Sequence, residues 1–212
     1  MLSNGRQAII AVLVALFCQA PAAGAASAQE QLQKAATDAA LRDALVREGR
    51  TASFFCANCH GEAGLSRFPE VPNLASQNAS YIVSQIEAFI AGRRRNEFME
   101  GLMKVLPERD KAAIATYFAS NAAVPAAATA GPRAREGAEH YKRLCVACHR
   151  ADGHGAENFP RLAGQQPEYL RASLRRYLSK SAARTSPEMT AAVVQLGDKN
   201  IEPIVEYLAS LK

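Results

Sequence analysis

The sequence predicts an all-α protein made of two tandem copies of one small domain. Three observations support this. The chain is rich in alanine, a strong helix former, and contains no tryptophan. Apolar residues recur at helical spacing in both halves, and no run alternates in the way that a strand requires. Landmark residues of the second half also repeat those of the first, at an offset that stays between 88 and 90 residues.

Residues 1–28 have the pattern of an export signal. Arg6 supplies a positive charge, residues 8–17 form a short apolar run, and residues 26–28 offer a small-x-small cleavage site. We therefore expect a mature chain that begins at Gln29. The alternative is a retained membrane anchor, but the apolar run is far shorter than the roughly 20 residues that span a bilayer. Cys18 lies in this segment and is assigned no function.

The first domain is predicted to cover residues 29–121. Apolar residues follow helical spacing from Tyr81 to Ile90, and Pro107 with Glu108 predicts the start of a helix that continues through Phe118.

An interdomain linker is predicted over residues 122–135, which are rich in alanine and include Pro125, Gly131 and Pro132. The second domain then covers residues 136–212. Pro167 predicts the first turn of one helix, and Pro203 places the start of the last helix near Asn200, because proline is tolerated only in a first turn.

The two copies share landmarks along their whole length. The paired positions are Cys56 and Cys145, Cys59 and Cys148, His60 and His149, Pro72 and Pro160, Leu74 and Leu162, Gln77 and Gln165, Tyr81 and Tyr169, Met99 and Met189, and Leu106 and Leu196. Each copy is close to the size at which an apolar core alone becomes marginal. A large, planar, covalently held cofactor would supply the missing apolar mass.

The formal charge of +5 falls to +4 once the signal is removed. This modest excess favours redox protein partners with acidic docking surfaces over nucleic acid. Two arginine clusters, at residues 93–95 and at Arg171, Arg175 and Arg176, are interpreted as solvated helix faces in preference to docking patches.

The sequence Cys-x-x-Cys-His occurs once in each copy, at residues 56–60 and 145–149. Two thiols three residues apart on a helical turn can form thioether bonds with the two vinyl groups on one side of haem. The next residue, histidine, then lies beneath the ring and binds the iron. We predict two covalently attached haem c groups, one at Cys56, Cys59 and His60, the other at Cys145, Cys148 and His149.

Other interpretations of these cysteines fit less well. A thioredoxin-like site needs a βαβ setting that neither copy shows. A four-cysteine zinc site would have to join equivalent points of two repeats, 86 residues apart. Neither of these, nor a disulfide framework, explains the histidine that follows each pair.

Methionine is the expected sixth ligand of both irons. Met99 and Met189 occupy equivalent positions of the repeat, which argues against simple core packing for both. A sulfur in this position raises the reduction potential and leaves no open site for a substrate. Met103, one helical turn beyond Met99, is a rival for the first iron. His140 and His154 have no counterparts in the first copy and are interpreted as surface or local structural residues.

With these motifs in view, each copy resembles a class I cytochrome c, and the pair resembles the periplasmic di-haem cytochrome c4 family. The resemblance rests on CANCHG at 56–61, PNLASQ at 72–77, RNEFM at 95–99, CVACH at 145–149, PRLAGQ at 160–165 and PEM at 187–189. It covers essentially the whole mature chain.

The resemblance implies two small helical domains whose haem edges face one another, with His–Met ligation at both irons. It also implies that the carbonyls of Pro72 and Pro160 accept the second N–H of the haem-bound histidines. The chain departs from the pattern where Ser76 stands opposite Gly164, where Arg150 stands opposite Gly61, and where the second copy lacks the Arg-Asn of residues 95 and 96.

The function expected from the sequence is electron transport, without catalysis. The resemblance implies a periplasmic respiratory role, from a quinol-oxidising complex toward a terminal oxidase. An alternative is the electron-accepting subunit of a flavocytochrome c sulfide dehydrogenase or of another periplasmic dehydrogenase. A di-haem peroxidase, which needs one open iron, fits less well because both copies carry the methionine.

Overall fold

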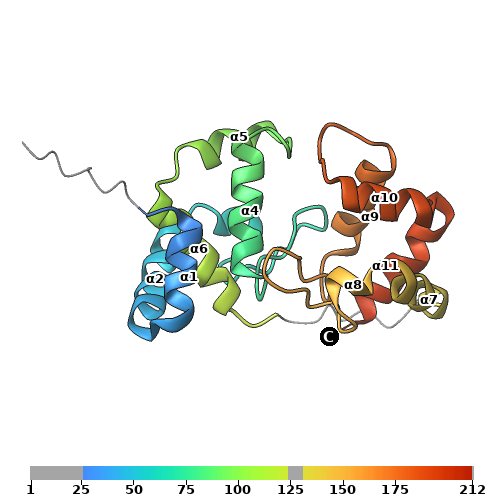
Figure 1. Ribbon diagram of the computed structural model, residues 1–212, viewed down its shortest axis with the longest axis horizontal. Coiled ribbons are helices and arrows are strands. Elements are labelled where there is room, and N and C mark those ends of the chain that lie inside the picture. Colours follow the sequence, from blue (N-terminus) through green and yellow to red (C-terminus); the bar gives the residue numbers. More distant parts are fainter. Residues whose placement is uncertain (1–25, 124–130, 212) are drawn as a thin grey trace, which may run out of the picture.

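Two helical domains lie side by side along the long axis of the computed structural model, which describes residues 26–123 and 131–211 (Figure 1). The first contains α1 (Ala28–Thr37), α2 (Ala39–Ala52), α3 (Ala57–His60), α4 (Ala79–Ile90), α5 (Glu97–Lys104) and α6 (Glu108–Ser120). The second contains α7 (Ala134–Leu144), α8 (Val146–His149), α9 (Pro167–Leu178), α10 (Pro187–Leu196), the short 3-10 helix η1 (Asp198–Asn200) and α11 (Ile201–Ser210).

The predicted all-α class and the internal repeat are confirmed. Helices α2 to α6 correspond in order to α7 to α11, apart from the extra turn η1, and α1 has no counterpart. In the described parts of the chain, β pairing is limited to two isolated bridges.

Helix α7 begins at Ala134, so the last two residues of the expected linker already belong to a helix. The last helix begins at Ile201, with Pro203 in its first turn.

Helices α2 and α6 of the first domain cross at a glycine, and so do α7 and α11 of the second. A Cβ at Gly49 of α2 would lie 2.0 Å from the Ala113 carbonyl oxygen of α6. A Cβ at Gly137 of α7 would lie 1.9 Å from the Pro203 carbonyl oxygen of α11. Both distances are far below van der Waals contact, so only glycine permits the backbones to approach this closely.

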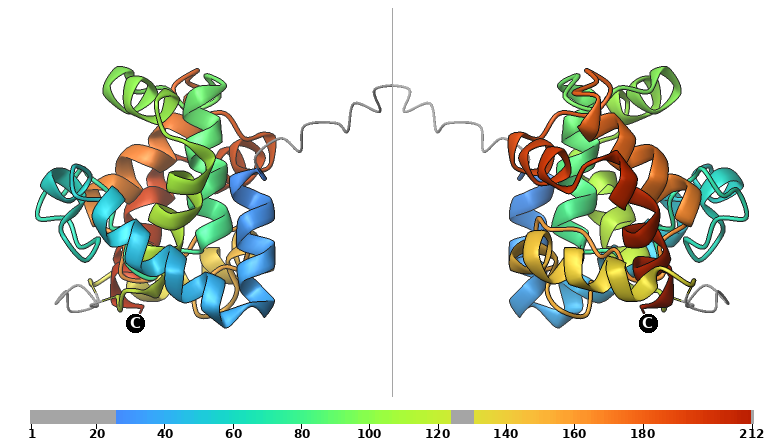
Figure 2. Two further views of the ribbon diagram at one scale, coloured as in Figure 1. Left: turned by 90° about the vertical axis from the view of Figure 1, so that its left-hand side faces the viewer. Right: turned by 90° about the vertical axis from the view of Figure 1, so that its right-hand side faces the viewer.

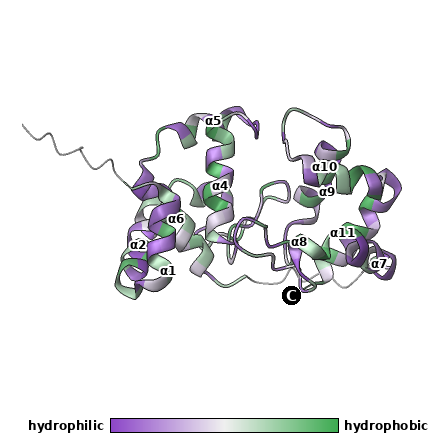
Figure 3. Ribbon diagram, in the orientation of Figure 1, coloured by the Kyte–Doolittle hydropathy of each residue, from purple (hydrophilic) through white to green (hydrophobic). Residues whose placement is uncertain are grey.

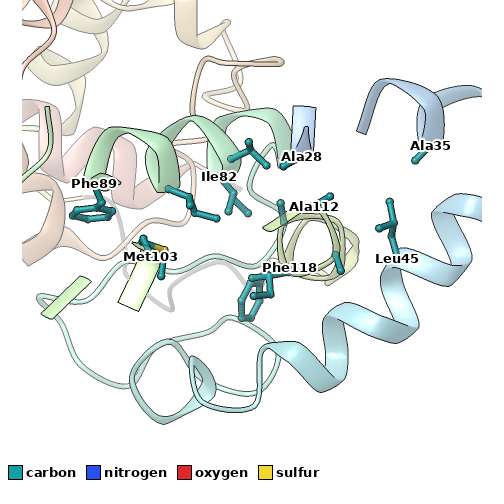
Figure 4. Close-up of a cluster of buried hydrophobic side chains, with 13 residues drawn as sticks. Ala28, Ala35, Leu45, Ile82, Phe89, Met103, Ala112 and Phe118 are labelled. Atoms are coloured by element: carbon teal, nitrogen blue, oxygen red, sulfur yellow. The ribbon is translucent and has the colours of Figure 1, made fainter. Parts of the chain in front are cut away.

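Each domain has its own apolar core. In the first, Leu45, Ile82, Phe89 and Phe118 gather around the small alanines of α6 (Figure 4). In the second, the core is formed by Tyr141, Leu170, Leu196, Ile201, Ile204, Val205 and Leu208. Hydrophobic residues accordingly concentrate on α4 and α11, whereas α7 is largely hydrophilic (Figure 3).

Helix α1 is anchored at its first residues. The Ser27 side chain accepts from the Glu30 amide while Glu30 accepts from the Ser27 amide, which is a capping box. Ala28 is buried, and its amide donates to the Glu108 carboxylate over 2.7 Å.

The expected export signal, residues 1–28, lies mostly outside the described residues. Cleavage after Ala28, as expected from the sequence, would remove both the cap and this buried residue.

Paired glutamines join the two domains. Gln165 accepts from the Asn73 amide over 2.7 Å and donates to the Asn73 carbonyl over 3.0 Å. Gln77 makes the same two bonds, of 2.7 and 3.0 Å, with the backbone of Arg161. Figure 2 views the molecule from its two ends, with the first domain nearest on the left and the second nearest on the right. Each domain thus supplies one glutamine to the backbone of the other.

Candidate metal centres

Both Cys-x-x-Cys-His segments form a single helical turn. In the first domain Cys56 is the N-cap of α3, and its carbonyl accepts from the amides of Cys59, at 3.2 Å, and His60, at 2.9 Å. The turn thus places both thiols and the His60 imidazole within five consecutive residues. Cys59 is exposed, Cys56 is partly buried and His60 is buried. Burial raises the pKa of the Cys56 thiol.

The second domain repeats this arrangement. Cys145 is partly buried, Cys148 is exposed, and His149 is buried at the end of α8. Burial raises the pKa of the Cys145 thiol to about 11. Tyr141 of α7 adds a support that the sequence did not reveal, because its hydroxyl donates to the Arg150 carbonyl over 2.7 Å. In the sequence, the only indication that Tyr141 is buried is its position on the apolar face of α7.

The ring of each histidine is oriented by a proline carbonyl. The Nδ1 atom of His60 lies 2.9 Å from the Pro72 oxygen, and Nδ1 of His149 lies 3.0 Å from the Pro160 oxygen. A carbonyl can only accept, so Nδ1 carries the proton and Nε2 keeps its lone pair. Burial lowers the pKa of both histidines, which favours the neutral ring that binds a metal.

Backbone conformation is the same in the two copies where their sequences differ. Gly61 (φ 80°) and Arg150 (φ 60°) both have positive φ at the end of the motif helix, and so do Ser76 (φ 57°) and Gly164 (φ 69°) after the proline segment. The backbone therefore has the same handedness at these two points of both loops. Arg150 and Ser76 adopt a conformation that glycine adopts more easily.

Each candidate methionine is the third residue of a helix. Asn96 caps α5, and its side chain accepts from the Met99 amide over 3.0 Å. Ser186 caps α10, and its hydroxyl accepts from the Met189 amide over 3.3 Å. Ser186 thus takes the place of the asparagine that the second copy lacks.

Met99 and Met189 are partly buried, whereas Met103 is 4% exposed and lies within the core of the first domain (Figure 4).

The two histidines outside the Cys-x-x-Cys-His motifs, His140 and His154, occupy different surroundings. Nδ1 of His140 lies 2.9 Å from an Arg143 nitrogen on the same helix. The His154 ring lies 3.4 Å from the Asp152 carboxylate.

These residues fit a covalently held haem. All four cysteines of the described chain are free thiols, and no group of three or more His, Cys, Asp or Glu converges there as a compact metal site would require. Each domain instead offers a thiol pair, an imidazole with an unprotonated Nε2, and a thioether on another helix. That donor set suits thioether attachment and six-coordinate iron, and does not suit tetrahedral zinc.

One residue of the arginine clusters, Arg94, differs from its predicted role. Arg171 forms ion pairs with Glu168 and Glu202 on the surface of the second domain. Arg94, in contrast, does not lie on a solvated helix face, because its guanidinium reaches Tyr169 of the other domain over 3.1 Å. Sequence reasoning missed this contact, and the crossed glutamines, because each depends on how the domains dock.

Over residues 26–123 and 131–211, none of the helices combines the length and the apolar character needed to cross a membrane.

Comparison with known proteins gives consistent results. A cytochrome c family profile matches residues 134–212. Cytochrome c4 of Thiocapsa roseopersicina is 31% identical over 74% of this chain and 86% of its own length. A thiosulfate dehydrogenase electron acceptor of Thiomonas intermedia is 29% identical over 95% of this chain and 88% of its own. The crystal structure of reduced cytochrome c4 from Pseudomonas stutzeri superposes with a TM-score of 0.71 at 27% identity, covering 79% of this chain and 98% of that one.

Proposed function

Because the chain belongs to the cytochrome c4 family and is therefore an electron-transfer protein with two covalent haem c groups, we propose that it is an exported carrier in a periplasmic respiratory chain. In this role it accepts electrons that originate at a quinol-oxidising complex and passes them toward a terminal oxidase.

The observation that carries this proposal is the matching pair of ligand sets. His60 with Met99, and His149 with Met189, come from equivalent helices of the two domains. The two histidines and two methionines would hold the haem irons through nitrogen and sulfur, and the cofactors would supply one-electron redox chemistry with no position left for a substrate. A structure that changes little between the two states suits repeated electron transfer.

The protein's own residues have separate tasks. Cys56, Cys59, Cys145 and Cys148 hold the cofactors by thioether bonds. The Pro72 and Pro160 carbonyls fix the tautomer and the orientation of the histidine rings. Asn96 and Ser186 start the helices that carry the methionines. The modest positive charge of the chain supports partners with acidic docking surfaces.

The test is a spectroscopic and redox study of the purified holoprotein. We expect two haems per chain, a sulfur-to-iron charge-transfer band that accounts for both irons, and two one-electron reductions. Carbon monoxide should bind slowly to the reduced protein. Rapid carbon monoxide binding at one haem, with a band for only one iron, would instead support a peroxidase-like open site and contradict the carrier.

A second candidate is the electron acceptor of a periplasmic dehydrogenase. It is favoured by the Thiomonas intermedia relative, whose match covers 95% of this chain. Stable co-purification with a flavoprotein or another catalytic chain, and reduction of this protein during turnover of that chain, would support this role. Reduction only by quinol-oxidising membranes would support the first.

We also propose that the export signal is removed after Ala25, so that the mature chain begins at Ala26. Residues 23–25 read Ala-Gly-Ala, a cleavage pattern as good as the one at residues 26–28. Cleavage there keeps the Ser27 cap and the buried Ala28. Intact mass measurement of the periplasmic protein distinguishes a chain starting at Ala26 from one starting at Gln29.

A further inference from the structure

The excess positive charge of the protein lies in its second half. Residues 29–121 contain 11 Lys or Arg and 11 Asp or Glu, whereas residues 122–212 contain 13 and 9. The first domain is therefore formally neutral. The whole excess of four positive charges follows residue 121 in the sequence.

Three exposed basic residues flank the second Cys-x-x-Cys-His motif. Lys142 and Arg143 lie in the last turn of α7, just before the motif, and Arg150 directly follows it. The Tyr141 hydroxyl donates to the Arg150 carbonyl over 2.7 Å, which holds the end of α8 against the last turn of α7. Between them Cys148, one of the two haem-bonding thiols, is exposed. We call Lys142, Arg143 and Arg150 the basic motif flank.

These three cations are not neutralised by the chain itself. Within residues 26–123 and 131–211, no Asp or Glu carboxylate lies within ion-pair distance of any of them. Arg143 contacts only the His140 ring, at 2.9 Å. Asp152, two residues beyond Arg150, accepts instead from the His154 amide over 2.9 Å. The basic motif flank therefore offers its charge to an external anion.

Arg150 is present in spite of an unfavourable backbone conformation. Its φ of 60° and ψ of 167° lie in a region that only glycine adopts without strain, and its equivalent in the first domain is Gly61. The dipole of α7 favours cations such as Lys142 and Arg143 in its last turn. No hydrogen bond or ion pair within the described chain involves the Arg150 side chain. Strain of this kind concentrates at functional sites.

The first domain has no such charge beside its motif. The residues equivalent to the basic motif flank are Ser53, Phe54 and Gly61. Phe54 is 82% exposed, and the adjacent Phe55 stacks on Phe98 with 6.2 Å between ring centroids. The surface beside the first motif is thus aromatic, whereas the surface beside the second is basic. The two domains present different chemistry to a partner.

On the proposed carrier function, we propose that the basic motif flank is the docking surface for an acidic redox protein, which exchanges electrons with the second haem and not with the first. Carboxylates of this partner pair with Lys142, Arg143 and Arg150. Unpaired cations also attract an acidic surface before contact and speed the encounter. One electron passes between the second iron and the redox centre of the partner, so that one is oxidised as the other is reduced. No bond forms or breaks.

The test measures how the holoprotein binds to gold coated with a carboxylate-terminated monolayer, by surface plasmon resonance at low ionic strength. The triple variant Lys142→Gln, Arg143→Gln and Arg150→Gln should bind at least about tenfold more weakly, since one cation near an anionic surface contributes about fivefold. Binding of the unaltered protein should fall steeply with added salt. A hydroxyl-terminated monolayer should bind neither protein.

The matched control is the triple variant Lys34→Gln, Arg42→Gln and Arg47→Gln. It removes the same charge from exposed positions of the first domain. It should retain most of the binding. Equal losses in the two triple variants would show that binding follows net charge alone, and would overturn the proposed docking surface.

A single variant, Arg150→Gly, excludes misfolding as the cause. It relieves the backbone strain, so it should fold at least as stably as the unaltered protein and still bind about fivefold more weakly. Unchanged binding in this variant and in the Lys142, Arg143 and Arg150 triple variant would contradict the inference.

Voltammetry on the same carboxylate surface identifies the haem that exchanges electrons. The faster wave should be the one that Met189→Ala displaces, which assigns it to the second haem. A faster wave that Met189→Ala leaves in place would contradict the proposal. Failure of the carrier proposal is recognised separately, in the unaltered protein in solution, by rapid carbon monoxide binding.

Discussion

At the scale of single residues, the candidate ligands are positioned by backbone geometry that the two copies share despite different side chains. Gly61 and Arg150 end the motif helices with ψ angles of 152° and 167° and positive φ. Asn96 and Ser186 both accept from the amide of a methionine. The repeat thus preserves conformation where it does not preserve residue type.

The proposed methionine ligands can be tested one at a time. Met189→Ala should open only the second iron, halving the sulfur-to-iron charge-transfer band and allowing carbon monoxide to bind one haem per chain. Met99→Ala should do the same for the first iron. Met103→Leu is the control: it replaces a buried core residue by one of similar volume, at a cost below about 1.5 kcal/mol, and should keep the full band. Loss of the band in Met103→Leu would reassign the ligand.

Backbone strain at Arg150 gives a prediction about stability. Arg150→Gly should raise the free energy of unfolding by about 1 kcal/mol, because the residue has φ 60° and ψ 167°, a region favourable only to glycine. Arg150→Ala keeps the strain and should give no gain. The converse change, Gly61→Ala, should destabilise, since its Cβ would lie 2.2 Å from the Leu65 oxygen. Urea unfolding of the three holoproteins measures these differences.

The sequence alone predicted those residues whose role depends on near neighbours in the chain. The cysteines and histidines are contiguous, so their chemistry could be inferred from spacing. The methionines followed from the repeat. Arg184 could not be inferred, because its hydroxyl partners Tyr81 and Tyr169 lie on two different domains.

At the scale of helices, two pairs of helices approach closely at a residue that has no side chain. Helices α2 and α6, and helices α7 and α11, cross at Gly49 and Gly137. These crossings bring each motif helix, which directly follows α2 or α7, against the core of its domain. The periodic pattern of apolar residues predicted the helices, but not the point at which two of them meet, because glycine has no hydropathy signal.

Adding one methyl group at a crossing should be costly. Gly49→Ala and Gly137→Ala should each lower the free energy of unfolding by about 2 to 3 kcal/mol, since the new Cβ would overlap a backbone carbonyl of the facing helix. Gly101→Ala in α5 is the matched control. Nothing lies within 4 Å of its Cβ, and alanine should raise helix stability by up to about 1 kcal/mol. Equal effects at Gly101 and Gly49 in thermal unfolding would contradict this account.

At the scale of the whole molecule, the domain interface and the metal centres share the same segments. Gln165 binds the backbone of Asn73, and Gln77 binds the backbone of Arg161. Asn73 and Arg161 directly follow Pro72 and Pro160, whose carbonyls orient the histidines. Docking of one domain therefore steadies the histidine support of the other. The repeat was visible in the sequence, but this coupling requires the docked structure.

Removing both glutamines should loosen the pair. In Gln77→Ala with Gln165→Ala, four hydrogen bonds to backbone groups of the other domain are lost, together with the two that the glutamines accept from the Asn78 and Gln166 amides. Partly buried backbone groups then remain unpaired, at up to about 1 to 3 kcal/mol for each group. We expect slower electron exchange between the haems and a larger radius of gyration in X-ray scattering. Gln33→Ala, at an exposed position of α1, should change neither. Unchanged exchange in the double variant would show that the glutamines do not hold the domains together.

The paired glutamines resemble a second set of contacts across the interface, in which Arg184 donates to the Tyr81 hydroxyl and Arg94 donates to the Tyr169 hydroxyl. In both sets, a residue of one domain contacts a position in the other domain, and the equivalent residue of that other domain returns the contact. This reciprocity defines an isologous dimer, in which two identical subunits meet through one self-complementary surface. The contacts are those of a symmetric dimer whose two halves are joined end to end. The halves are not identical, since Phe89 of α4 and Tyr177 of α9 occupy equivalent positions.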